Sequence, residues 1–170
     1  PRMVSMFRAA FPSFSRTRAV GTPQTIQSTA SLGPTGTDDR SAYFFGYEGG
    51  RTAFLSSAVR LTVPVEAQII GTTGMIEIHE PWINPRTVTL ATPVAPGVQS
   101  RLIFEGNLFD RRTMHVPTQG NGYNYEAMEV GRCLRAGVTE SPVMPLDESL
   151  AIMRALDTMR GQWGLKYPGE

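Results

Sequence analysis

The 170-residue sequence contains one cysteine, no long apolar run and no excess of either charge. Cys133 cannot form an intrachain disulfide, which favours a reducing compartment, and we predict a cytoplasmic protein in which this cysteine packs within a helix. No apolar run approaches the roughly 18 residues that suggest a membrane span. Sixteen basic and fifteen acidic residues leave a formal charge of +1. The sequence therefore carries no electrostatic signature of nucleic-acid or membrane-surface binding.

Glycine-rich nucleotide motifs are also missing. The stretch IIGTTGMIEI, residues 69–78, has two glycines three positions apart, but it lacks the G-x-G-x-x-G spacing and is followed by a strand-like run rather than a helix. No G-x-x-x-x-G-K-[ST] motif occurs anywhere. We interpret Gly71 and Gly74 as residues that permit the tight turn of a hairpin, so no cofactor is expected to bind to this chain alone.

Patterns for metal binding or acid–base catalysis are sparse. His79 and His115 have no second ligand at metal spacing, so we predict no metal site and a surface or hydrogen-bonded role for each. Asp38 and Asp39 are adjacent at the start of a predicted strand, where they point to opposite faces and cannot readily share a proton. Glu126 is expected in the first turn of a helix, where a negative charge interacts favourably with the helix dipole, so it is not taken as an acid–base group. Arg111 and Arg112 are interpreted as two solvated charges in a loop.

The composition that is present, 41% hydrophobic and 18% charged, is that of a globular domain. Between residues 25 and 105, β-rich segments alternate with turn-forming separators such as GPTGTDD, YEGG and PWINP. The connections are too short for parallel crossovers, so neighbouring strands are expected to be antiparallel. The predicted strands are TIQSTASL, SAYFFGY, RTAFLSSAVRLTV, AQII, MIEI, RTVTL and RLIFEG.

Helical patterns occupy the two ends of the chain. Residues 1–20 are weakly helical and form a separate N-terminal segment, whereas residues 21–170 form the main domain. Asn124 is expected to cap a helix from Tyr125 to about Ala136, with Gly137 just beyond its end. Pro145 is expected to open a last helix that Gly161 and Gly164 end. One face of that helix should be an apolar stripe of Leu146, Leu150, Met153, Leu156, Met159 and Trp163.

The predicted fold class is therefore α+β, a mainly antiparallel open sheet with helices packed on one face. Two long segments then carry a resemblance: TGTDDRSAYFFGYEGGRTAFLSSAVRLTVPVEAQIIGTTGMIEIHEPW, and GYNYEAMEVGRCLRAGVTESPVMPLDESLAIMRALDTMRGQWGLKYPGE. They resemble the C-terminal domain of the Gfo/Idh/MocA oxidoreductases, and in particular the dihydrodiol dehydrogenase-like branch. In that branch T-G-[VT]-D-D, G-T-x-G-x-[IL], Y-E-A and [TK]-E-S-P-[VL]-[MI]-P recur in this order. The resemblance covers about residues 19–170.

The resemblance implies a two-domain NAD(P)-dependent oxidoreductase that acts on hydroxyl groups of sugars, polyols or cyclic diols. An N-terminal Rossmann domain binds NAD or NADP, and the antiparallel domain supplies part of the substrate pocket. In many members its open sheet face forms the interface of a homo-oligomer. The family's glycine-rich loop, its E-K-P motif and its D-x-G-x-[HY] segment are absent from this sequence. We therefore assign no catalytic residue to it.

Two aromatic residues match branch positions near the substrate. Trp82, in the proline-bracketed EPWINP, matches a tryptophan that walls the substrate site, although a core or interface tryptophan is an equal alternative. Tyr123, in GNGYNYEA, matches a position near the pocket mouth, against simple packing over the helix start. The leading hypothesis is a substrate-binding and oligomerisation domain of an oxidoreductase. The alternative is a non-catalytic, stand-alone scaffold or oligomerisation module, so whether the chain is part of an enzyme remains open.

Overall fold

The computed structural model describes residues 21–94, 108–167 and 169. It contains seven strands and two α-helices, and the chain divides into two compact units, residues 1–63 with 130–170 and residues 64–129. The elements are β1 (Thr25–Leu32), β2 (Asp38–Gly46), the 3₁₀ turn η2 (Glu48–Gly50), β3 (Thr52–Ala58), β4 (Ala67–Gly71), β5 (Gly74–Ile78), β6 (Thr87–Pro93), β7 (Phe109–His115), α2 (Tyr123–Arg135) and α3 (Leu146–Trp163).

The first unit is built on a three-stranded antiparallel sheet in the order β1-β2-β3. Alternate residues of β2 point to opposite faces, so Tyr43 and Phe45 lie on one face and Phe44 on the other. Tyr43 and Phe45 are buried, and Phe44 is half exposed. The sheet therefore has one covered and one open face, as antiparallel sheets commonly do.

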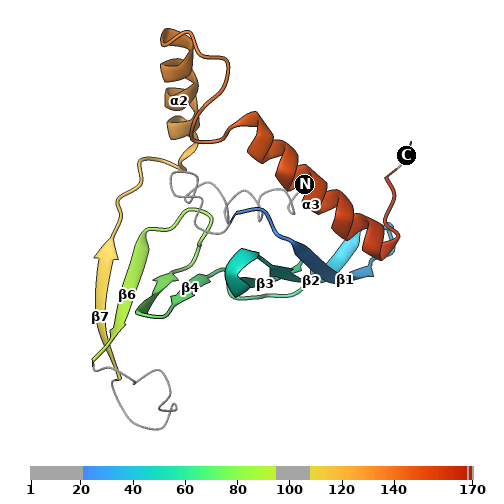
Figure 1. Ribbon diagram of the computed structural model, residues 1–170, viewed down its shortest axis with the longest axis horizontal. Coiled ribbons are helices and arrows are strands. Elements are labelled where there is room, and N and C mark those ends of the chain that lie inside the picture. The colour runs from blue at the N-terminus through green and yellow to red at the C-terminus, as the bar shows by residue number, and fades with distance from the viewer. Residues whose placement is uncertain (1–20, 95–107, 168, 170) are drawn as a thin grey trace. The chain divides into compact units, whose positions relative to one another are not determined.

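Helix α3 covers the buried face of this sheet and passes over β1, as Figure 1 shows. Leu156 and Met159 pack against Tyr43 and Phe45, and the Trp163 ring lies 5.8 Å from that of Tyr43 between centroids. Burial raises the pKa of Tyr43, and the pKa of Tyr47 in the same cluster is also raised by burial. The aromatic face of β2 and the second half of α3 thus form the core of the first unit.

The second unit is a four-stranded antiparallel sheet in the order β4-β5-β6-β7. Its strands follow one another along the chain, and each pairs with the next in an up-and-down meander. One face carries apolar pairs such as Ile76 opposite Leu90 and Val88 opposite Met114. The other face carries polar pairs such as Thr89 opposite Thr113.

The predicted glycine hairpin is confirmed. Gly71 and Gly74 face each other across β4 and β5 and leave Thr72 and Thr73 as a two-residue connection. Glycine at position 74 lets β5 approach β6 closely, because a Cβ atom there would lie 2.7 Å from the carbonyl oxygen of Ala91 on β6. The strand β5 follows directly, so the glycines serve a sheet and no helix begins after them.

Helix α2 begins two residues before the predicted start, so Asn124 lies inside the helix and the prediction of it as the cap is wrong. The Asn121 side chain instead accepts a hydrogen bond from the Tyr123 backbone N–H. The predicted end is confirmed: Gly137 has φ 67°, and the Val138 N–H donates to the Cys133 carbonyl at 3.1 Å. That bond is typical of a Schellman motif. Cys133 is a buried free cysteine in this helix.

Helix α3 begins after Pro145, as predicted, and ends at Gly164, whose φ is 67°. Gly161 lies within the helix, so its predicted role in ending it is wrong. The predicted apolar stripe divides into two halves. Its C-terminal half is the core described above, whereas Leu146, Leu150 and Met153 are exposed. The sheet meets only the second half of the helix, which explains the difference.

The α+β fold class is confirmed, with the described strands arranged in two antiparallel sheets. β3 ends at Ala58, not at residue 63, although the Val59 N–H still donates to the Asp39 carbonyl of β2 at 2.9 Å. The Asp39 side chain also binds Arg60 in an ion pair at 3.0 Å. β7 was not predicted, and the interpretation of Arg111 and Arg112 as loop residues is wrong, since both lie on this strand. The helical segment 1–20 and the strand at 101–106 lie outside the described residues.

No helix among the described residues is long and apolar enough to cross a membrane.

Candidate functional site

The loop between β5 and β6 holds Trp82 in a defined position. The His79 N–H donates to the Thr87 carbonyl at 3.1 Å, which closes the loop at its base. Inside the loop, the Trp82 N–H donates to the Val65 carbonyl at 2.8 Å. The Asn84 N–H donates to the Pro81 carbonyl at 2.9 Å. Trp82 is half-buried on a loop fixed by backbone hydrogen bonds at three places.

The chain after β7 runs close to the end of that loop. The Val116 N–H donates to the Arg86 carbonyl at 2.8 Å, which extends the pairing of β6 and β7 beyond both strands. Three residues further on, the Gln119 N–H donates to the Tyr125 hydroxyl at 3.1 Å. Tyr123 follows as the first residue of α2, and 69% of its surface is exposed. Both ends of the segment from Val116 to Gln119 are therefore held in place.

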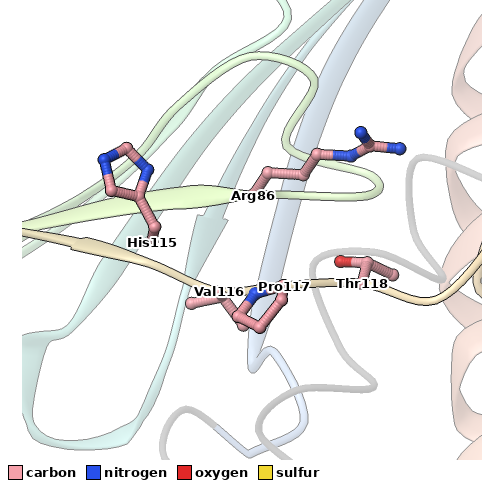
Figure 2. Close-up of a pocket in the computed structure, with 5 residues that line it drawn as sticks. All are labelled: Arg86, His115, Val116, Pro117 and Thr118. Atoms are coloured by element: carbon pink, nitrogen blue, oxygen red, sulfur yellow. The ribbon is translucent and has the colours of Figure 1, made fainter.

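A pocket of about 470 Å³ lies where these two segments meet. Its lining residues are Arg86, His115, Val116, Pro117 and Thr118. Figure 2 shows Val116 and Pro117 between His115 and Thr118 along one segment, with Arg86 on the neighbouring one. Pockets of a few hundred cubic ångströms with an apolar wall and a few polar groups are typical of small-molecule sites.

A polar network covers the sheet face from which His115 projects. The His79 Nε2 atom lies 2.8 Å from the Thr89 hydroxyl, which is 2.9 Å from the Thr113 hydroxyl. The His115 Nδ1 atom lies 3.3 Å from the Thr87 hydroxyl. The predicted hydrogen-bonded role of both histidines is thus confirmed. The contact with Thr87 orients His115, which is the histidine that lines the pocket.

The same face holds an ion pair between Arg111 of β7 and Glu77 of β5. The two charges neutralise each other across β6, which lies between β5 and β7. Arg111 is therefore paired and is not a solvated loop charge. Arg86 has no such partner among the described residues. The pocket therefore retains a guanidinium whose charge is not matched by a neighbouring carboxylate in the described part of the chain.

The described residues do not fit a dinucleotide. The glycines of GTTG belong to a hairpin between two strands, and no helix N-terminus follows them to face a phosphate. Among the described residues, no cluster of three or more histidine, cysteine or carboxylate side chains is placed to hold a metal ion. The pocket offers one cationic, two polar and two apolar side chains to solvent, and no step of a redox reaction is assigned to them.

Trp82 and Tyr123, the two residues nominated from the sequence, both lie near this pocket along the chain but do not line it. Trp82 comes four positions before Arg86, and Tyr123 comes five positions after Thr118. Their rings make no stacking contact with each other in the described structure. Their assignment to the substrate stays a prediction.

Sequence reasoning missed Arg86 and the segment after His115 as pocket residues. The signal was weak, because β7 was not recognised as a strand. Without β7, nothing brings residue 86 next to residues 115–118. The Val116–Arg86 hydrogen bond that joins the two segments depends on the pairing of β6 with β7.

No family model matches the chain. Curated relatives that do match it share one name. The trans-1,2-dihydrobenzene-1,2-diol dehydrogenase of Xenopus tropicalis is 31% identical over 149 residues, which are 86% of this chain and 42% of the relative. The mouse protein of the same name is 30% identical over 154 residues, 86% of this chain and 41% of the relative. The chain thus spans about two fifths of the length of the curated relatives it matches.

Solved structures with a similar fold are oxidoreductases. UDP-N-acetylglucosamine 3-dehydrogenase from Acidithiobacillus ferrooxidans matches with a TM-score of 0.58 and 13% identity, over 85% of this chain and 44% of that one. A levoglucosan dehydrogenase in complex with NADH and levoglucosan matches with a TM-score of 0.55 and 14% identity, over 81% of this chain and 42% of that one. At this identity the likeness establishes the fold alone.

Proposed function

The chain is a sequence relative of the dihydrodiol dehydrogenases and shares the fold of Gfo/Idh/MocA-type oxidoreductases, and on this premise we propose that it is the substrate-binding domain of an NAD(P)-dependent oxidoreductase. The proposed substrates carry hydroxyl groups, as sugars, polyols or cyclic diols do. The observation that carries the proposal is the 31% identity to a dehydrogenase over 86% of the chain. The resemblance inferred from the motifs is confirmed by the same match.

The dinucleotide is proposed to bind outside the part of the relatives that this chain matches. One solved relative by fold contains NADH, and the described residues of this chain offer no phosphate cradle. In such an enzyme the nicotinamide supplies the hydride chemistry, while the protein positions the substrate and excludes water. We assign the positioning role to the loop of Trp82 and, at the mouth of the site, to Tyr123.

The geometry of the loop supports this role for Trp82. A half-buried indole on a loop fixed by three backbone hydrogen bonds offers a flat apolar surface that loses little entropy on binding. Such a surface stacks on the face of a sugar or of a cyclic diol. The exposed ring of Tyr123 at the start of α2 offers a hydroxyl and a second apolar surface.

The two tryptophans provide the test, because Trp82 lies in the second unit and Trp163 in the first. In a Trp163→Phe variant, fluorescence reports on Trp82 alone. Titration with trans-1,2-dihydrobenzene-1,2-diol and with levoglucosan is expected to give a saturable change. Calorimetry of a Trp82→Ala variant is expected to show affinity weakened by about tenfold, the loss of one aromatic contact.

A parallel titration with NADH and NADPH is expected to give no saturable binding. Saturable binding of either dinucleotide to this chain contradicts the division of roles proposed above. Absence of any diol or sugar binding by the unaltered chain favours the stand-alone scaffold instead.

We further propose that the chain self-associates through the open face of the three-stranded sheet. Phe44 and Phe54 lie directly opposite each other on β2 and β3, on the face away from α3. Their exposed fractions are 44% and 74%. An exposed aromatic pair in a sheet is costly in water and is typical of a surface that another chain covers.

The self-association is tested by light scattering of the chain and of a Phe54→Ser variant. The variant is expected to shift the population towards monomer while the circular dichroism spectrum stays unchanged. Arg154, exposed on α3 at the opposite face of the sheet, offers the control: Arg154→Gln changes a polar residue away from the proposed interface and is expected to leave the oligomer intact. A Phe54→Ser variant with the mass of the parent chain contradicts the proposed interface.

A further inference from the structure

The pocket at the end of the four-stranded sheet contains a side-chain charge that the described structure leaves unpaired. Arg86 lines the pocket and its side chain makes no ion pair or hydrogen bond with the described residues. Its backbone carbonyl, in contrast, is fixed by the Val116 N–H at 2.8 Å. The base of the side chain is thus held in place while the guanidinium remains available to a ligand.

The other polar groups of the pocket are hydrogen-bond donors or can become donors. Thr118 contributes a hydroxyl. His115 uses Nδ1 towards the Thr87 hydroxyl and leaves Nε2 without a partner among the described residues. No carboxylate lines the pocket. The guanidinium of Arg86 and the hydroxyl of Thr118 lie at the same end of the pocket in Figure 2, away from the His115 ring, and both are donors that match the acceptor oxygens of an anion.

The remaining wall is apolar. Val116 and Pro117 lie between His115 and Thr118 on the same segment, as Figure 2 shows. The lining therefore combines donors for a charged group with a surface for the carbon skeleton that bears it. At about 470 Å³, this open surface pocket has room for a small organic molecule.

We propose that this pocket binds an organic anion through its carboxylate or phosphate group, with Arg86 as the charged anchor and with Thr118 as an additional hydrogen-bond partner. The planar guanidinium binds two oxygens of either group side by side. Val116 and Pro117 contact the apolar edge of the ligand. The proposal stands on the pocket alone and does not depend on the dehydrogenase function.

The test uses three probes of the same carbon skeleton: glucuronate, glucose 6-phosphate and glucose. Binding of each to the full chain is measured by calorimetry at low ionic strength, and amide shifts in ¹H–¹⁵N spectra locate the site. We expect at least one of the two acidic probes to bind more tightly than glucose and to shift the amides of residues 115–118. The tighter acidic probe identifies whether a carboxylate or a phosphate is preferred.

Replacing one arginine at a time tests whether the acid binds at this pocket. Arg86→Gln is expected to weaken binding of the preferred acid by about tenfold or more, the usual effect of losing a charge-assisted hydrogen bond. Arg86→Lys keeps the charge but loses the planar fork, so an intermediate loss is expected. Arg112→Gln is the matched control, because Arg112 is exposed on β7 and does not line the pocket.

Three outcomes overturn the proposal. The first is glucose binding as tightly as both acids, and the second is neither acid binding. The third is Arg86→Gln and Arg112→Gln weakening the acid equally, which identifies a response to net charge. Because Arg86 is exposed, its variants are expected to fold, and circular dichroism of each variant verifies this.

Discussion

Replacing Thr89 by valine removes the centre of the polar network on the four-stranded sheet without changing the shape of the side chain. Thr89 is 3% exposed, and its hydroxyl lies 2.8 Å from His79 Nε2 and 2.9 Å from the Thr113 hydroxyl. A partner left unsatisfied in a buried position costs about 1–3 kcal/mol. Water cannot readily replace a hydroxyl at a position so well covered. We therefore expect the free energy of unfolding to fall by about 2 kcal/mol.

The measurement is urea unfolding followed by the fluorescence of Trp82 in a Trp163→Phe background, since Trp82 lies in the same unit as the network. With a denaturant slope of about 1–3 kcal/mol/M, the midpoint is expected to fall by on the order of 1 M. Thr113→Val is the matched control. Thr113 is an exposed residue, so water can take the place of its hydroxyl, and a loss below about 0.5 kcal/mol is expected. Equal losses in the two variants refute the argument from burial.

Further predictions concern the core and the hairpin. Met159→Ala, at a fully buried site under the three-stranded sheet, is expected to cost about 2–5 kcal/mol in thermal or urea unfolding. Gly74→Ala places a Cβ atom 2.7 Å from the Ala91 carbonyl oxygen, so the strands must move apart, and a loss of about 1–3 kcal/mol is expected; a neutral result contradicts the close approach. Burial raises the pKa values of Tyr43 and Tyr47, so these groups ionise first in the unfolded chain: stability is full below about pH 10 and falls above it. Tyr47→Phe is expected to flatten that fall by up to about 1.4 kcal/mol per pH unit, measured by unfolding between pH 8 and 11.

Most of the strands could be predicted from the sequence because alternation and turn residues are visible within each segment by itself. Alternating residues define β1 within the same bounds as the structure, and the glycines of GTTG define the hairpin. The end of α2 was predicted for the same reason, since Gly137 supplies the left-handed residue that such a helix end requires. The antiparallel arrangement followed from connections too short for crossovers.

The errors arose where a residue's role depends on a distant partner. β7 is rich in polar residues, and its own sequence shows no strand pattern. It forms a strand because it pairs with β6 along its whole length. The exposure of Leu146 depends on how far the sheet extends beneath α3. The pocket at Arg86 was missed for this reason as well. It is formed only when segments about thirty residues apart pair.

The order of the elements along the chain has a consequence for biosynthesis. The three-stranded sheet is made first, but the helix that covers it contains Gln162, which bonds to Ile26 across 136 positions. A ribosome adds about 5–20 residues per second, so the aromatic face of β2 stays uncovered for on the order of 10 seconds. During that interval the strands β4 to β7 are synthesised. Nascent chains of this protein therefore expose an aromatic surface that favours aggregation until α3 has been synthesised.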